Sequence, residues 1–135
     1  MPKRIVISKL GGPEVLNYEE YSLPKIIKDK EVRIRHTAIG LNYIDTYHRS
    51  GIYPLPSELP TCLGMEAAGE IIEIGNEVTN FKIGDRVAYA TPPIGAYCEI
   101  RDFPAEKLIA IPDFLTDDEV ASILLQGMTV EYLFE

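Results

Sequence analysis

Two histidines and two cysteines are the side chains of this sequence that could bind a metal or act as nucleophiles. His36 and His48 stand twelve residues apart, and Cys62 and Cys98 lack the C-x-x-C spacing of a zinc or redox motif. A zinc site would need both histidines and one cysteine to meet in space, because zinc prefers nitrogen and sulfur ligands. A histidine on the apolar face of a strand is more often a buried structural residue than a metal ligand, and so is an isolated cysteine. The residues alone therefore predict neither a metal site nor, without a G-x-S-x-G motif, a serine nucleophile.

Glycine-rich phosphate loops are the next candidates, and none is complete. Gly64 and Gly69 have the spacing of a P-loop, but Glu70 stands where such a loop has lysine, and its carboxylate would repel phosphate. No G-x-G occurs, so the dinucleotide-binding fingerprint is absent. The formal net charge of −8 argues against nucleic acid as a partner, because an acidic surface repels phosphate backbones.

The elements that must position these residues are mainly short strands. Val32, Ile34, His36 and Ala38 share one face of a segment whose other face is polar, an alternation typical of a half-buried strand. Further strands, separated by Gly, Pro and Asn, are expected at residues 4–9, 16–22, 67–74, 87–89, 96–100 and 108–111. Many short strands at this spacing favour a barrel-like or strongly curved antiparallel sheet. The predicted fold class is mainly β (α+β).

Two segments are expected to be helical. Residues 42–49 show no alternation and predict a short helix. Thr116 and Glu119 form a capping box, which predicts that a second helix begins there and runs to about residue 126. Gly127 is expected to break this helix, and the apolar residues after it predict a further helix that is cut short.

Length and composition indicate a single soluble domain. The chain has 135 residues, of which 46% are hydrophobic and 25% charged, ordinary values for a globular protein. No apolar run approaches the ~20 residues of a membrane span, and the N-terminus has no signal-peptide core. We therefore expect a cytoplasmic protein that does not bind a membrane.

Several blocks of the sequence together resemble quinone oxidoreductases of the medium-chain dehydrogenase/reductase superfamily, in their N-terminal domain. The blocks are residues 11–16, 40–54, 64–69, 81–88, 95–97 and 127–129. They occur in order and cover essentially the whole chain, which makes the resemblance specific. It implies a GroES-like fold, a curved β-barrel with short helices. It also implies the zinc-free branch, since Asn42 and Met65 stand where zinc-dependent relatives have a cysteine and a histidine.

The resemblance implies hydride transfer from NADPH to a quinone or another conjugated carbonyl compound, without a metal. In this family the cofactor lies in a cleft between a GroES-like domain and a Rossmann domain. The matching positions place Asn42 and Tyr47 near the nicotinamide, as catalytic and cofactor-binding residues, and Thr129 on the hinge side as a cofactor-binding residue. The Tyr47 hydroxyl could bond to the substrate oxygen as charge develops there, and the Asn42 amide could position it. Tyr53 and Arg49 are weaker candidates. From the residues alone, Tyr47 is more simply an ordinary half-buried tyrosine on a short helix.

The chain departs from the family in length, because family members are considerably longer and carry a Rossmann domain that is absent here. We expect residues 1–126 to form the GroES-like, substrate-side domain and residues 127–135 to begin the truncated helical connection to a missing nucleotide-binding domain. NADPH would then bind only with a Rossmann partner, made as a separate chain or lost with an interrupted gene. Two alternatives stay open. One is a non-enzymatic remnant or interaction module that self-associates or docks through its exposed apolar C-terminal helix. The other is half of a related zinc-free enoyl or alkenal reductase.

Overall fold

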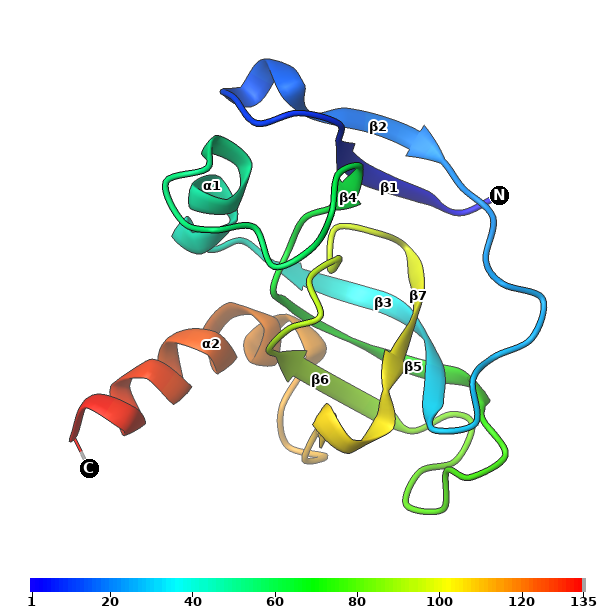
Figure 1. The fold of residues 1–135 in the computed structure, drawn as a ribbon. Coiled ribbons are helices and arrows are strands. Elements are labelled where there is room, and N and C mark those ends of the chain that lie inside the picture. Colours follow the sequence, from blue (N-terminus) through cyan, green and yellow to red (C-terminus); the bar gives the residue numbers. More distant parts are fainter. Residues whose placement is uncertain (135) are drawn as a thin grey trace.

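The computed structural model describes residues 1–134, which form two antiparallel sheets and two α-helices (Figure 1). The smaller sheet has the order β2-β1-β4, with β1 at Lys3–Ile7, β2 at Asn17–Glu20 and β4 at Thr61–Cys62. The larger sheet has the order β7-β3-β5-β6-β8. Its strands are β3 at Glu31–Gly40, β5 at Glu66–Ile74, β6 at Arg86–Ala90, β7 at Ile100–Pro104 and β8 at Ile109–Ala110. The helices are α1 at Tyr43–Ser50 and α2 at Asp117–Phe134.

β3 pairs with both β7 and β5, and its sequence alternation explains how it sits in the larger sheet. Val32 and Ile34 are buried, whereas Arg35 is exposed, so the predicted half-buried strand is confirmed. The buried face contributes to the main hydrophobic core, in which the rings of Tyr89 and Phe103 stack with centroids 4.1 Å apart. Removal of these apolar side chains from water is the main driving force that holds the sheet in place.

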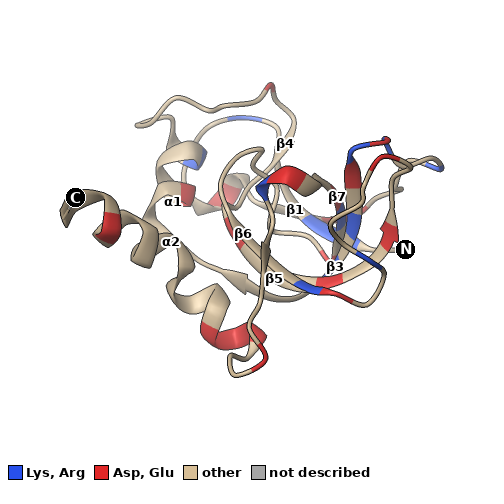
Figure 2. Cartoon of the chain, turned by 90° about the horizontal axis from the view of Figure 1, so that it is seen from below, with Lys and Arg blue, Asp and Glu red and all other residues tan. Residues whose placement is uncertain are grey.

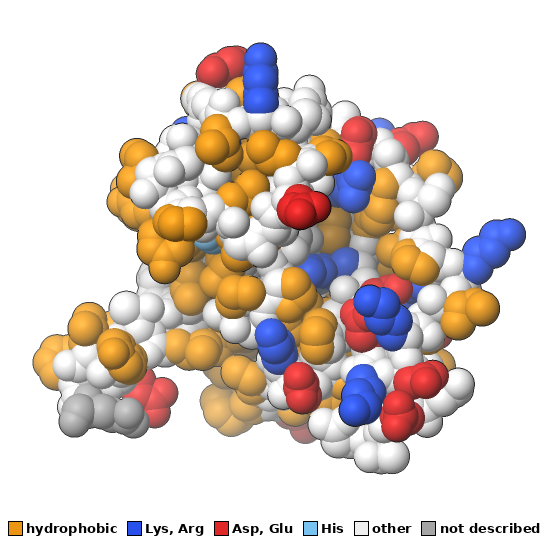
Figure 3. Space-filling view, viewed as in Figure 1, with side chains coloured by type: hydrophobic (Ala, Val, Ile, Leu, Met, Phe, Trp, Pro, Cys, Tyr) orange, Lys and Arg blue, Asp and Glu red, His pale blue; other side chains and the backbone are white. Residues whose placement is uncertain are grey.

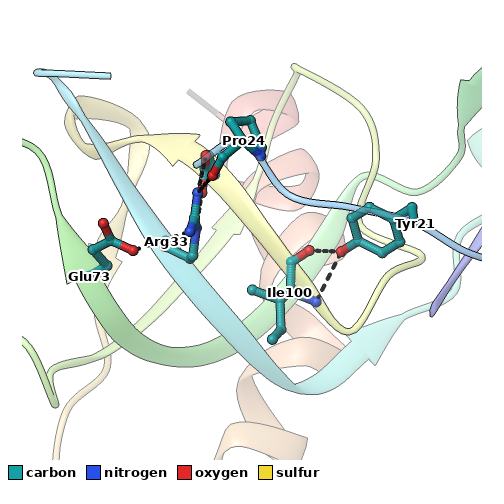
Figure 4. A network of polar contacts seen from close by, with 6 residues as sticks. Tyr21, Pro24, Arg33, Glu73 and Ile100 are labelled. Carbon is teal, nitrogen blue, oxygen red and sulfur yellow. Dashed lines mark hydrogen bonds and ion pairs between the residues drawn. The ribbon is translucent and has the colours of Figure 1, made fainter. Parts of the chain in front are cut away.

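Arg33 links β3 to both neighbouring strands and to the chain before it (Figure 4). Its Nε and Nη2 donate to the two carboxylate oxygens of Asp102 on β7, at 2.7 and 3.0 Å. Its Nη1 donates to Glu73 of β5 at 3.1 Å, and Nη2 also donates to the Pro24 carbonyl at 2.7 Å. The bond to Asp102 raises the pKa of the Arg33 guanidinium, which stays charged at any physiological pH. Because the paired bonds to Asp102 require one geometry, they specify the register of β3 against β7.

α2 begins at the predicted capping box, which is confirmed. The Thr116 N–H donates to the Glu119 carboxylate at 3.2 Å, and the Glu119 N–H donates to the Thr116 hydroxyl at 3.1 Å. Val120 and Ala121 of the first turns are buried against a second apolar cluster that includes Ala68 of β5. Beyond these turns, α2 projects away from the sheets (Figure 1). Packing on the larger sheet therefore holds the N-terminal part of the helix.

Two elements differ from the sequence-based expectation. α2 continues through Gly127, so the expected break and separate second helix are wrong. A glycine inside a helix costs only about 1 kcal/mol relative to alanine, which the neighbouring turns outweigh. Residues 96–99 are not part of a strand, because β7 begins at Ile100 and Cys98 makes only an isolated bridge with Arg4.

The fold class itself, mainly β with two α-helices, is confirmed. In the described part of the chain the two sheets stay separate, and their strands do not close into a continuous barrel. Within residues 1–134, none of the helices is long and apolar enough to cross a membrane.

Candidate functional site

α1 begins just after β3 leaves the larger sheet, and Asn42 is its N-cap residue. The Asn42 N–H donates to Oδ2 of Asp45 at 3.1 Å, which satisfies a backbone donor at the helix start. The helix ends at Gly51, whose φ of 85° is a left-handed conformation that glycine adopts at little cost. The short helix predicted for residues 42–49 is therefore confirmed, and β3 fixes where it starts.

Glu66 of β5 is the central group of the candidate site, a carboxyl side chain on a residue only 2% exposed. Its Oε1 accepts from Nδ2 of Asn42 at 2.9 Å, and its Oε2 accepts from the main-chain N–H of Leu125 in α2 at 2.8 Å. In a regular helix that N–H would bond to the carbonyl of Ala121, so a side chain here enters the main-chain hydrogen bonding of α2. Gly40 leaves the room for this, because a Cβ there would lie 2.5 Å from both Oε1 of Glu66 and the Ala121 carbonyl oxygen. Glu66 thus joins β5, α1 and α2.

The structure connects two of the three predicted site residues, Asn42 and Thr129, through Glu66 and Leu125. Asn42 bonds to Glu66, and Glu66 bonds to the N–H of Leu125. The Thr129 hydroxyl donates to the carbonyl of the same Leu125 at 3.0 Å, so Asn42 and Thr129 both connect to one turn of α2. Tyr47 lies on α1, is 41% exposed and stands outside this hydrogen-bonded group. The catalytic and cofactor-binding roles of these residues stay predictions.

The two weaker candidates have structural contacts. The Arg49 Nε donates to the Gly11 carbonyl at 3.3 Å, and the Arg49 carbonyl accepts from the Gly11 N–H at 3.0 Å. The Tyr53 ring packs edge-on against the His48 ring, with centroids 5.8 Å apart. Arg49 therefore holds the turn at Gly11 against α1. Tyr53 covers the buried ring of His48.

Sequence reasoning missed a pair of buried polar residues on the inner face of α1. Asp45 and His48 are each 3% exposed, and the Tyr97 hydroxyl donates to Oδ2 of Asp45. Within residues 1–134, Oδ1 of Asp45 and Nδ1 of His48 have no hydrogen-bond partner. Burial raises the pKa of Asp45, although the bonds from Tyr97 and Asn42 oppose this shift, and burial lowers the pKa of His48 against the pull of the Asp45 carboxylate. His48 is therefore uncharged at pH 7. The only sequence signal was the i,i+3 spacing of the two residues, which is too common to be diagnostic.

Exposed apolar side chains gather on α1, on the loop after it and along α2, and Figure 3 shows a hollow between these parts of the surface. On the α1 side they are Leu41, Tyr43, Tyr47, Ile52 and Tyr53. On α2 they are Ile123, Met128, Val130, Tyr132, Leu133 and Phe134. α2 contains no Lys or Arg, and Figure 2 shows the basic residues mainly toward the N-terminal side of the molecule. A surface of this kind suits a flat apolar group or a partner's apolar face better than it suits phosphate.

The residues that a zinc site would need lie apart. His36 Nδ1 is 3.8 Å from Sγ of Cys98, whereas His48 lies on the buried face of α1 with Asp45. Across residues 1–134, no group of three or more His, Cys, Asp or Glu side chains could hold a metal ion.

The chain is similar in sequence to known oxidoreductases. The profile of the alcohol dehydrogenase GroES-like domain matches residues 28–132. A quinone oxidoreductase of Pseudomonas aeruginosa is 53% identical over 98% of this chain, which spans 40% of that protein. The 2-haloacrylate reductase of a Burkholderia species is 47% identical over 95% of this chain, which spans 39% of that protein. The chain therefore spans about two fifths of the length of the curated relatives it matches.

Solved structures agree with the sequence comparison. A Pseudomonas syringae quinone oxidoreductase superposes on all of this chain with a TM-score of 0.93 and 48% identity, over 41% of its own length. The Escherichia coli quinone oxidoreductase complexed with NADPH superposes on 98% of this chain with a TM-score of 0.92 and 43% identity, over 40% of its own length. The predicted resemblance to quinone oxidoreductases and the predicted GroES-like fold are confirmed.

Proposed function

The chain belongs to the alcohol dehydrogenase GroES-like domain family, and we propose that it is the substrate-side domain of a metal-free, NADPH-dependent quinone oxidoreductase. The observation that carries the proposal is its similarity to quinone oxidoreductases over 98% of its length. The buried Glu66 supports it, because its bond to Nδ2 fixes the orientation of the Asn42 amide at the start of α1. A positioned amide next to an exposed apolar surface is what the binding of a flat carbonyl compound requires.

The residues of this chain fit the nicotinamide ring of NADPH but not its phosphates. The Asn42 amide, the half-exposed Tyr47 ring and the apolar surface around them fit a nicotinamide or a quinone ring. The phosphates of the cofactor find no match, since the sequence has no glycine-rich phosphate loop and α2 carries no Lys or Arg. A Rossmann-type domain must therefore supply the phosphate site, either in the same polypeptide or as a separate chain.

The chemistry assigned to this chain is orientation and charge stabilisation. NADPH supplies the hydride when it is bound. Tyr47 donates a hydrogen bond from its hydroxyl to the substrate carbonyl oxygen, where negative charge develops during reduction. Asn42 holds the ring of the substrate or nicotinamide in a fixed orientation, because Glu66 prevents its amide from rotating. Thr129, bonded to Leu125, contributes to the cofactor side from α2.

A chimera tests the proposal directly. Residues 1–134 replace the matching segment of the Pseudomonas aeruginosa quinone oxidoreductase, and NADPH oxidation is followed with a benzoquinone and with 2-chloroacrylate. We expect turnover with the quinone and a fall in kcat/KM of about 10²-fold on Tyr47→Phe, the cost of losing one oxyanion donor. Asn42→Ala should cause a fall of about the same size, because a misoriented ring also costs about 10²-fold. The matched control is Tyr18→Phe, a substitution at an exposed position on β2. A folded chimera that binds NADPH and reduces no quinone refutes the function, whereas unchanged kinetics in both variants refute only the residue roles.

Two alternatives have specific observations behind them. The 2-haloacrylate reductase relative favours reduction of an activated carbon–carbon double bond, and faster turnover of the acrylate than of the quinone would establish it. The exposed apolar side chains of α2 favour an interaction module that self-associates or docks to another protein. Sedimentation velocity of the 135-residue chain tests the self-association, which a monomer at all concentrations would exclude.

A further inference from the structure

The two cysteines, far apart in sequence, lie next to each other along one edge of β1. Cys62 of β4 pairs with Val6, and Cys98 makes an isolated bridge with Arg4. Alternate residues of a strand point to the same face and are separated by about 6.6 Å, so both cysteine side chains project from one face of the small sheet. The separation is within the range of up to about 6.8 Å between the Cα atoms of a disulfide. The main-chain carbonyl of Tyr97 lies between them, since it accepts from Sγ of Cys62 at 3.4 Å and precedes Cys98 directly.

The surroundings give the two thiols different properties. The neighbouring Cys62 thiol lowers the pKa of the Cys98 thiol, and His36, whose Nδ1 is 3.8 Å from Cys98 Sγ, acts in the same direction against the effect of burial. The proximity of Cys98, together with burial, raises the pKa of Cys62, which keeps its proton. Arg101 also favours the thiolate at Cys98. Cys98 is therefore the more nucleophilic sulfur, because the thiolate is the reactive form.

A small molecule can reach this pair. A cavity of about 260 Å³ is lined by both cysteines together with Arg4, Tyr21 and Arg101 among other residues. A volume of this size holds a small solute, because one water takes about 30 Å³. Tyr21 forms one wall, where its hydroxyl donates to the carbonyl of Ile100 and accepts from the N–H of the same residue at 3.3 Å (Figure 4).

We propose that Cys62 and Cys98 form a dithiol site that a small hydroperoxide oxidises to an intramolecular disulfide. The Cys98 thiolate attacks one oxygen of the peroxide, an S–O bond forms as the O–O bond breaks, and the leaving oxygen takes a proton to become an alcohol or water. The Cys62 thiol then attacks the Cys98 sulfenic acid, the S–S bond forms, and the S–O oxygen leaves as water. Two thiols are oxidised and one peroxide is reduced. The site does not depend on the proposed quinone reduction.

The test uses the full chain and hydrogen peroxide. After oxidation the protein is denatured in acid and treated with N-ethylmaleimide, and its intact mass is measured. We expect the chain to lose two hydrogen atoms and to take up no maleimide, while reductant restores two reactive thiols. A chain that still takes up two maleimide groups, or that forms only intermolecular dimers in non-reducing electrophoresis, overturns the proposal.

Single variants identify which sulfur reacts first. In Cys62→Ser, the sulfenic acid should persist at Cys98 and be trapped by dimedone. In Cys98→Ser, oxidation of Cys62 should be about tenfold slower than that of Cys98 in Cys62→Ser, because burial still raises the pKa of the Cys62 thiol after Cys98 is removed. Circular dichroism of each variant verifies folding, and the wild-type mass measurement decides the main proposal even if one variant fails to fold. Faster oxidation of Cys62 than of Cys98 overturns the assigned order.

Discussion

Replacement of Glu66 by alanine is the strongest test of how the candidate site is held together. The variant leaves two donors without an acceptor, the Asn42 side-chain amide and the Leu125 main-chain N–H. An unsatisfied buried donor costs about 1–3 kcal/mol, and the half-buried Asn42 amide is at the low end because it can turn toward water. With a small cavity term added, we expect Glu66→Ala to lower the free energy of unfolding by about 3 kcal/mol.

Urea unfolding followed by circular dichroism measures this loss. With an m value of about 1.5 kcal/mol/M, the midpoint should fall by about 2 M. Glu66→Gln should cost only about 1 kcal/mol, because the glutamine oxygen can accept from Leu125 while a rotated Asn42 amide accepts from its NH₂ group. The matched control is Glu70→Ala, an exposed carboxylate on the same strand, which should change stability by less than about 0.5 kcal/mol.

A double-mutant cycle with Asn42→Ala then isolates the contact itself. Because the two side chains bond directly at 2.9 Å, we expect a coupling free energy of about 1 kcal/mol. A loss below about 1 kcal/mol for Glu66→Ala would refute the view that this carboxylate organises α1 and α2. Additive effects of the two substitutions would refute its bond to Asn42 as the stabilising contact.

Two further predictions concern stability. Burial lowers the pKa of His48 in the folded state below its ordinary 6.5, so folding releases a proton from this side chain. The stability that neutral His48 gives the folded state is therefore present above pH 6.5. It is lost as the pH falls toward the lower pKa of His48 in the folded state. Denaturation between pH 8 and pH 5 should show this loss, and His48→Gln should reduce the slope; an identical slope would contradict the assignment. Alanine should have opposite effects at Gly127 and Gly40. Gly127→Ala, with nothing within 4 Å of its new Cβ, should raise the free energy of unfolding by about 0.5–1 kcal/mol. Gly40→Ala, whose Cβ would meet two oxygens at 2.5 Å, should lower it by about 1–3 kcal/mol. Thermal melts measure both, and equal effects would contradict the packing described around Gly40.

The parts of the fold that follow local rules could be predicted from the sequence. The alternation around Val32 and Ile34 and the capping box at Thr116 depend on residues within a few positions of one another, and both are confirmed. The end of α2 could not be predicted, because the modest cost of Gly127 is outweighed by the helix on either side. Contacts that unite distant segments left no local signal.

The candidate site also combines local features that the sequence predicts with long-range contacts that it does not. The helix carrying Asn42 and Tyr47 was predictable, and the resemblance named both residues. The bond from Glu66 to Leu125 spans 59 positions, and the bond from Tyr97 to Asp45 spans 52, so neither leaves a pattern in the sequence around it. Glu66 is not among the residues that the sequence predicts for the site, and only its bonds to Asn42 and Leu125 show that it joins β5, α1 and α2.

The two bonds of the Glu66 carboxylate also determine when the candidate site can be completed during protein synthesis. Synthesis proceeds from the N-terminus at roughly 5–20 residues per second, so Leu125 leaves the ribosome roughly 3–12 s after Glu66 does, 59 positions earlier. During that interval Asn42 is already available, but the second oxygen of the carboxylate has no N–H from α2. The two bonds of the Glu66 carboxylate are therefore complete only when nearly the last segment of the described chain has emerged. A nascent chain from which β8 has emerged and Leu125 has not would have its described β-strands available while the candidate site is still unfinished.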